Sequence, residues 1–254
     1  MKNTRYRLTT THPVSFKACV VADLHDHSYK GILPILKSEC PDLILVPGDL
    51  TEGLLSDVSP ADRPGLALLR ECTTIAPTFY TFGNHEMGGC HRNIRRAKRA
   101  DAPVSFTLSP AWREIIDSTG ATLLHQEHTE WNGLIIGALG SGLLNPHWIP
   151  DLSMLEAFSA SKGYKLLLCH HPEYFDRYLR PYPIDLIVSG HAHGGQWRVF
   201  GRGVYAPDQG LFPKYTGGLH ENRLVISRGT ANSARPIPRF FNPCEVVTVE
   251  VRQK

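Results

Sequence analysis

Short apolar runs rich in β-branched residues alternate along this chain with polar turns and with segments of helical character. The runs have the length of buried strands, and they predict eight strands, at residues 16–22, 43–46, 77–82, 134–139, 164–169, 185–189, 223–227 and 245–251. Four segments predict helices, at residues 32–40, 61–72, 89–100 and 151–158. This alternation predicts an α/β fold.

Polar side chains that can bind metal follow five of the predicted strands. These side chains are Asp23 and His25, Asp49, Asn84 with His85 and Glu86, His170 with His171, and His191 with His193. In open α/β sheets, ligands bind in the crevice beyond the carboxyl ends of the strands. The five strand ends are therefore expected to converge on one site.

The candidate ligands offer oxygen and imidazole nitrogen but no thiolate. Such a set suits Mn²⁺, Fe²⁺/Fe³⁺ or Zn²⁺ in five- or six-coordinate sites better than a structural tetrahedral zinc. A catalytic zinc ion needs only three protein ligands, whereas at least seven candidates are present here. Two metal ions account for the set better than one.

Each motif also has an interpretation as an ordinary turn, because glycine, asparagine and histidine are common in turns. A single Asp-x-His or Gly-Asp pair is a weak signal, and a single Gly-Asn-His-Glu or Gly-His-x-His turn is a moderate one. The turn interpretation requires five independent coincidences at strand ends of the same polarity. The metal-site interpretation is therefore favoured.

The composition is that of a globular protein, with 42% hydrophobic and 20% charged residues in 254 positions. No linker divides the chain, so one domain is expected over residues 1–254. The formal net charge of +3 is too small to imply a nucleic-acid partner. The six cysteines form no Cys-x-x-Cys pair, and neither an export segment nor a membrane-spanning run is apparent, so a cytoplasmic location is expected.

The order of the motifs resembles that of the calcineurin-like metallophosphoesterase family. Five blocks carry the resemblance: Asp23-x-His25, Gly48-Asp49, Gly83-Asn84-His85-Glu86, His170 and Gly190-His191-x-His193. The resemblance implies a four-layer α/β/β/α sandwich of two mixed β-sheets flanked by helices. The implied first metal site consists of Asp23, His25, Asp49 and His193, and the second of Asp49, Asn84, His170 and His191. Asp49 would bridge the two ions, and His85 would stand beside them as general acid and phosphate contact.

Further stretches, GHAHGGQ, APDQGLFPKYTGGL, VISRG and RFFNPCEV, resemble the bacterial YaeI/YkuE-type phosphodiesterase subgroup of this family. The resemblance implies a metal-dependent phosphodiesterase in which hydroxide attacks phosphorus in line. Two alternatives remain: a noncatalytic metal-binding scaffold on the same fold, and a phosphomonoesterase or protein phosphatase. The complete ligand set with His85 favours catalysis, and GNHEMGGCHR favours a diesterase.

Four further residues are candidate substrate contacts. They are His27, His171, Gln196 and Arg228. The alternative for His27 is a side chain that faces solvent, and the alternative for Gln196 and Arg228 is an ordinary turn or packing role. For His171 the favoured position is behind the metal ligands or in the pocket wall, since the resemblance assigns the ligand role to His170.

A basic segment follows the Gly-Asn-His-Glu turn. If residues 89–100 are helical, one stripe is formed by Arg92, Arg95, Arg96 and Arg99. The stripe is either a solvated face or an electropositive rim that attracts phosphorylated small molecules, lipid-linked substrates or an anionic membrane surface. Nucleic acid is disfavoured because no aromatic residues interleave with the arginines.

Overall fold

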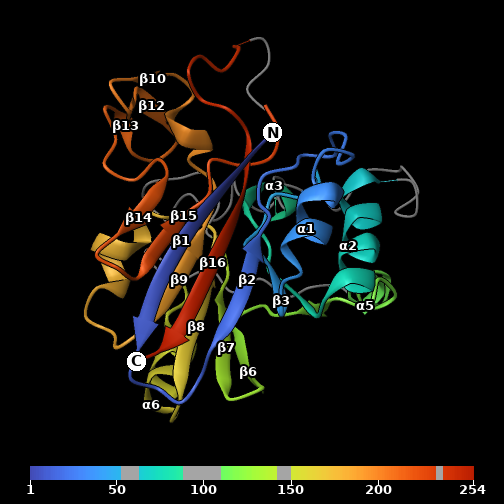
Figure 1. Ribbon diagram of the computed structural model, residues 1–254, viewed down its shortest axis with the longest axis vertical. Coiled ribbons are helices and arrows are strands. Elements are labelled where there is room, and N and C mark those ends of the chain that lie inside the picture. The colour runs from blue at the N-terminus through green and yellow to red at the C-terminus, as the bar shows by residue number, and fades with distance from the viewer. Residues whose placement is uncertain (53–62, 88–109, 142–149, 233–236) are drawn as a thin grey trace, which may run out of the picture.

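Two six-stranded β-sheets pack face to face in the computed structural model of the chain (Figure 1). The structure describes residues 1–52, 63–87, 110–141, 150–232 and 237–254. Helices lie on the outer face of each sheet. The architecture is therefore the α/β/β/α sandwich that the sequence led us to expect.

The first sheet has the strand order β1-β16-β2-β3-β4-β5. Its strands are β1 Lys2–Thr10, β16 Glu245–Gln253, β2 Phe16–Val20, β3 Leu43–Val46, β4 Thr78–Tyr80 and β5 Thr122–Leu123. All neighbouring strands are parallel except β16 and β2, which are antiparallel. Strand β16 therefore lies between the first two strands of the chain.

The second sheet has the order β14-β15-β9-β8-β7-β6. Its strands are β14 Gly218–His220, β15 Leu224–Ile226, β9 Leu186–Ser189, β8 Tyr164–Cys169, β7 Leu134–Leu139 and β6 Glu127–Trp131. The four central strands are parallel, and each edge strand is antiparallel to its neighbour.

Two small hairpins lie at the end of the molecule opposite helix α6 (Figure 1). One hairpin pairs β10 Arg198–Val199 with β11 Arg202–Gly203, and the other pairs β12 Tyr205–Ala206 with β13 Gly210–Leu211.

The central strands carry apolar residues on both of their faces. They therefore appear in the sequence as continuous apolar runs. In β2, Ala18 and Val20 pack in the core between the sheets, whereas Cys19 packs against helices. In β8, Leu168 faces the shared core and Leu167 faces the outer helical layer. Burial on both faces is typical of parallel strands covered by helices.

The helices close the two outer faces. On the first sheet lie α1 Leu33–Glu39, α2 Pro64–Ile75 and α5 Pro110–Asp117. On the second lie α6 Ser153–Ala160 and a π-helical turn, Phe175–Leu179. No helix in the described part of the chain has the length and hydropathy needed to cross a membrane.

All eight predicted strands are present, with ends shifted by up to two residues. Three of the four predicted helices match α1, α2 and α6, while the helix predicted at 89–100 lies outside the described residues. Strand β1 was not predicted, because it is mostly polar and its two arginines flank Tyr6. In the structure Arg5 pairs with Glu39 and Arg7 with Glu250, so these charges lie along the edge of the sheet.

The shared core provides a test of the packing. Leu45 is fully buried between the sheets, so Leu45→Ala should lower the free energy of unfolding in urea by about 2–5 kcal/mol. The matched change Leu211→Ala removes the same atoms from a side chain that is 70% exposed. It should change the free energy of unfolding by less than about 0.5 kcal/mol. Equal losses would contradict this assignment of the core.

Candidate metal centre

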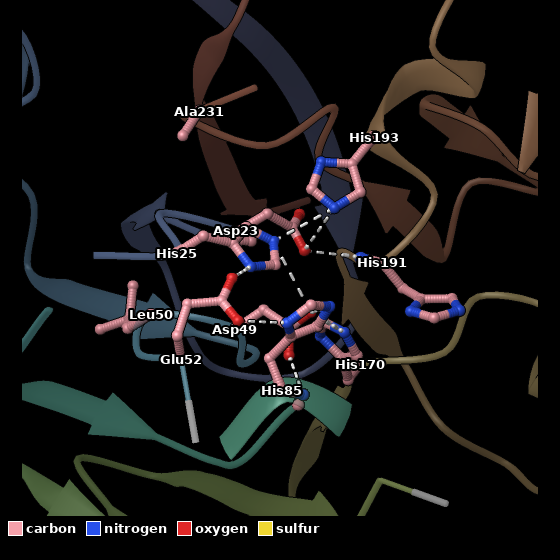
Figure 2. A network of polar contacts seen from close by, with 12 residues as sticks. Asp23, His25, Asp49, Leu50, Glu52, His85, His170, His191, His193 and Ala231 are labelled. Carbon is pink, nitrogen blue, oxygen red and sulfur yellow. Dashed lines mark hydrogen bonds and ion pairs between the residues drawn. The ribbon is translucent and has the colours of Figure 1, made fainter. Parts of the chain in front are cut away.

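Six of the predicted metal ligands come together where β2, β3, β8 and β9 end (Figure 2). Possible ligand atoms of Asp23, His25, Asp49 and His193 lie within 4.8 Å of one another, as do those of Asp49, His170 and His191. Asp49 belongs to both groups. The seventh, Asn84, begins the short helix α3 Asn84–Met87 after β4 and is buried.

The backbone turns sharply at most of these residues. Positive φ angles, between 46° and 66°, occur at Asp23, His25, Asp49, His191 and His193. Such angles are uncommon for residues other than glycine, and they cluster where a site requires a particular side-chain direction. The left-handed backbone at these five positions sets the direction in which each side chain leaves the chain.

Two glycines allow the ends of β3 and β4 to approach each other. A methyl group on Gly83 would overlap the Asp49 carboxylate, and one on Gly48 would overlap the backbone of Gly83. Gly48 also has a φ of 110°, which favours glycine. Glycine at both positions therefore lets Asp49 occupy the middle of the cluster.

Asp49 is the centre of the charge distribution. Its Oδ2 atom lies 3.1 Å from His170 Nε2 and 3.8 Å from His25 Nε2. Burial alone would raise the pKa of Asp49, but His170 and the neighbouring histidines hold it well below its usual value. Burial alone would lower the pKa of His170. The negative charge of Asp49 has the larger effect and raises the pKa of His170 to about 9. The cluster therefore holds a stable buried anion.

Other polar atoms in the cluster lack protein partners. Asp23 Oδ2 and Asn84 Oδ1 are buried and have no hydrogen-bond partner among the described residues. Burial, followed by the charge of Asp49, raises the pKa of Asp23. An unsatisfied buried polar group costs about 1–3 kcal/mol. Metal cations coordinated by these oxygen and imidazole donors would remove that cost, so the residues fit the metals that the family resemblance implies.

Arg239 contacts the candidate ligand His193. Its Nη2 atom lies 3.0 Å from His193 Nδ1, and because a guanidinium can only donate, Nδ1 is the acceptor. The proton of the neutral ring then lies on Nε2, which is 3.2 Å from His25 Nε2. Binding of a metal through Nε2 would displace that proton. Arg239 begins the stretch RFFNPCEV, to which no role in the site was assigned from the sequence.

Glu52 joins a candidate ligand to the candidate acid. One carboxylate oxygen lies 2.8 Å from His25 Nδ1 and the other 2.8 Å from His85 Nδ1 (Figure 2). These hydrogen bonds lower the pKa of Glu52 to about 2. Burial alone would lower the pKa of His85. The effects of Glu52 and Asp49 are larger and raise the pKa of His85 to about 9. His85 Nε2 lies 4.0 Å from Asp49 Oδ2, and its side chain is 34% exposed.

Glu86 has a different role from the other polar residues at the strand ends. It was grouped with the metal-capable side chains, but its buried carboxylate faces the backbone. It accepts hydrogen bonds from the N–H groups of Asp49, Leu50, Thr51 and Gly83, at 2.6–3.1 Å, and from the Tyr80 hydroxyl at 2.9 Å. Glu86 therefore fixes the turn that carries Asp49.

His171 lies behind His191. Its Nδ1 is 3.0 Å from Glu173 Oε1, and its ring stacks on Tyr174. His191 Nε2 lies 3.1 Å from Asp208 Oδ2, so Nδ1 of His191 is the nitrogen left for a metal. A carboxylate on the second nitrogen is the usual support of a metal-binding histidine. Possible ligand atoms of His171, Glu173, His191 and Asp208 also lie within 4.8 Å of one another. The expected place of His171 behind the ligands or in the pocket wall stays a prediction.

The other candidate substrate contacts are His27, Gln196 and Arg228. His27 belongs to none of the groups of possible metal ligands in the described part of the chain. Gln196 Nε2 donates to Ile237 O at 2.6 Å, and Arg228 forms an ion pair with the buried Glu245. Their substrate contacts remain predictions. The arginine stripe, Arg92, Arg95, Arg96 and Arg99, lies outside the described residues.

With the fold and the donor cluster established, comparison with known proteins identifies the family. The family model for calcineurin-like phosphoesterases matches residues 16–195. The chain belongs to this family. The matched region contains all seven predicted ligands and His85.

Several bacterial proteins are similar to the chain over most of its length. Phosphodiesterase YaeI of Escherichia coli is 31% identical over 232 residues, which are 85% of this chain and 76% of YaeI. The uncharacterised metallophosphoesterase YkuE of Bacillus subtilis is 24% identical over 93% of this chain and 79% of its own length. Another, Cj0846 of Campylobacter jejuni, is 25% identical over 91% of this chain but only 56% of its own length.

Metal content tests the two-ion arrangement. Two transition-metal ions per chain are expected by mass spectrometry of the purified protein, because the ligands form two groups that share Asp49. Asp49→Asn removes the charged residue common to both groups and should lower both occupancies, whereas Asn84→Ala should lower one. A single ion in the parent chain, or equal content in the two variants, would contradict the arrangement.

The Glu86 network yields a prediction that does not depend on activity. Glu86→Gln replaces an acceptor oxygen by an NH₂ group that faces backbone N–H donors, so it should destabilise the chain by about 1–3 kcal/mol and weaken metal binding. Tyr80→Phe removes only one donor to this carboxylate and should cost about 1 kcal/mol. Urea unfolding and calorimetric metal titration measure both effects. Unchanged metal affinity in Glu86→Gln would contradict the role of this turn.

Proposed function

We propose that the chain is a phosphodiesterase that uses two transition-metal ions, Mn, Fe or Zn. The observation that carries the proposal is the pairing of a buried donor cluster with a partly exposed histidine at its edge. His85 is oriented by Glu52, which also orients the candidate ligand His25. A residue that only filled a turn would not require this shared carboxylate.

The metal ligands and His85 have different roles in the proposed hydrolysis. When bound, two cations would lower the pKa of a water molecule and stabilise charge on the phosphoryl oxygens. Water attack on phosphorus breaks one P–O bond and yields a phosphomonoester and an alcohol. His85 is suited to protonate the departing oxygen from Nε2, because Glu52 holds Nδ1 and favours the charged ring. No serine or cysteine nucleophile is required.

A diester substrate is supported by the similarity to YaeI, which is named a phosphodiesterase. The complete donor set and His85 favour catalysis over a noncatalytic scaffold. A panel of phosphomonoesters, phosphodiesters and pyrophosphates, assayed after chelation and reloading with Mn²⁺, Co²⁺, Zn²⁺ or Mg²⁺, tests the proposal. Faster hydrolysis of monoesters than of diesters with every metal would reject it in favour of a phosphomonoesterase.

His85 should matter most when the leaving group is poor. A p-nitrophenolate has a pKa of about 7 and departs without help, whereas an alkoxide does not, and general acid catalysis contributes roughly 10²–10⁴-fold. His85→Ala should therefore retain metal but lose much more kcat on an alkyl diester than on bis-p-nitrophenyl phosphate.

The diagnostic measurement is the dependence of log kcat on leaving-group pKa, which should be steeper for His85→Ala than for the parent. Glu52→Gln leaves the imidazole in place but weakens its support, so it should give an intermediate slope. Parallel lines for the parent and His85→Ala would show that His85 binds phosphate and that another residue supplies the proton.

A further inference from the structure

The exposed apolar side chains are gathered at one end of the molecule. Of the ten large hydrophobic side chains that are exposed in the described part of the chain, nine lie in two short segments. They are Trp197, Val199, Phe200, Tyr205, Leu211, Phe212, Ile237, Phe240 and Phe241, and together we call them the apolar rim. The most exposed are Phe200, at 101%, and Phe241, at 88%. A concentration of this kind marks an interaction surface more often than chance exposure.

The two segments of the rim are joined to each other. Trp197 Nε1 donates to Pro238 O at 2.8 Å, and the Trp197 ring contacts Phe240 at a centroid distance of 5.9 Å. Trp197 and Phe240 also form a backbone bridge. The rim is therefore one surface, formed by the hairpins β10–β11 and β12–β13 (Figure 1) and by residues 237–241.

The rim is also connected to the metal centre. The turn Gly194–Gly195 follows His193 directly, and Gly195 O accepts a hydrogen bond from Val204 N at 3.1 Å. Asn242 Nδ2 donates to His193 O at 2.7 Å, while Arg239 contacts the His193 ring. Whatever covers the rim is thus brought close to the candidate ligands.

Two hollows in the rim have mainly apolar walls. One, of about 500 Å³, lies between Val199, Phe200, Val204 and Phe212, with Arg202 at its edge. The other, of about 220 Å³, is lined by Trp197, Leu211 and Ile237 among others. The apolar walls of these hollows add to the hydrophobic surface that the rim exposes.

The exposed charged side chains in the two segments of the rim are basic. Residues 196–214 and 237–241 contain four basic residues, of which Arg202 and Lys214 are exposed. Lys214 pairs with Asp176, Arg198 donates to the carbonyls of Gly194 and Gly201, and Arg239 faces His193. The two segments contain one acidic residue, Asp208, whose carboxylate faces His191 and is only 12% exposed. Arg202 is exposed beside Phe200. Aromatic side chains with basic neighbours are typical of surfaces that bind the interface of an anionic membrane.

We propose that the apolar rim docks the chain onto the surface of an anionic phospholipid bilayer. Phe200 projects from the turn of hairpin β10–β11 and Phe241 from the segment 237–241. Such projecting side chains suit insertion among lipid headgroups better than a flat contact with a second protein. If the proposed phosphodiesterase function holds, docking presents the metal centre to phosphodiesters held in that surface, so amphiphilic phosphodiesters are the substrate class.

Cosedimentation with vesicles tests the docking. The parent chain should bind vesicles of equal parts phosphatidylcholine and phosphatidylglycerol, bind phosphatidylcholine vesicles more weakly, and lose affinity for the anionic vesicles as salt is raised. Phe200→Ser with Phe241→Ser should weaken binding roughly tenfold or more, since both side chains lose apolar burial in the interface. Phe200→Trp should retain binding and show a blue shift of tryptophan fluorescence on adding vesicles.

A charge reversal with a matched control isolates the electrostatic part. Arg202→Glu should weaken binding to the anionic vesicles by roughly tenfold. Lys37→Glu makes the same change at an exposed position on α1, away from the hairpins, and should leave binding unchanged. Equal effects of the two substitutions would mean that net charge alone governs binding and would overturn the assignment to the rim.

Two further results separate this proposal from others. The serine double variant should hydrolyse bis-p-nitrophenyl phosphate like the parent but act more slowly on a phosphodiester lipid in vesicles. If the parent hydrolyses no diester, the proposed function fails while vesicle binding still decides the docking. The docking proposal is overturned if the parent chain does not bind anionic vesicles, or if the double variant binds them as tightly as the parent. It is also overturned if sedimentation equilibrium shows that the parent is a dimer and the double variant a monomer.

Discussion

The structure of the site depends on keeping the negative charge of Asp49 in a buried position. An isolated buried carboxylate is costly, and such a group normally becomes protonated. Here the imidazole of His170 lies 3.1 Å from one carboxylate oxygen, and the backbone N–H of His85 donates to the other at 2.9 Å. Glycines at 48 and 83 provide the space, and Glu86 holds the turn. The two ligand groups share Asp49 because these constraints act together.

Much of the site was predictable because the candidate ligands follow apolar strands directly. Strand ends in a parallel sheet meet at one edge, so Asp23 could be grouped with Asp49 in one sheet, and His170 with His191 in the other, without tertiary information. That the two groups meet depends on the packing of the two sheets. The position of Glu52 near the site was also predictable, because Glu52 stands three residues after Asp49 at the same strand end. Its role was missed because a carboxylate that contacts two histidines has no local pattern.

Other features could not be predicted because they depend on contacts between distant segments. Arg239 reaches His193 across 46 residues of sequence, and Asp208 reaches His191 across 17. Both lie in stretches that carry the subgroup resemblance, RFFNPCEV and APDQGLFPKYTGGL, but neither stretch indicates which residue it contacts. Strand β1 was missed for a related reason. Its partner β16 lies at the other end of the chain, and its own residues are too polar to indicate a buried strand.

The position of β16 between β1 and β2 has a consequence for the order of assembly. During synthesis β1 and β2 emerge first, but β1 has no neighbour in its sheet until β16 arrives to pair with it. The segment leading into β16 also holds the first candidate ligand in place, because Thr230 N and Ala231 N donate to the carbonyls of Ala22 and Asp23. Contacts so distant in sequence slow folding. The metal centre should therefore reach its final shape only after β16 has left the ribosome, so metal loading follows the synthesis of that strand.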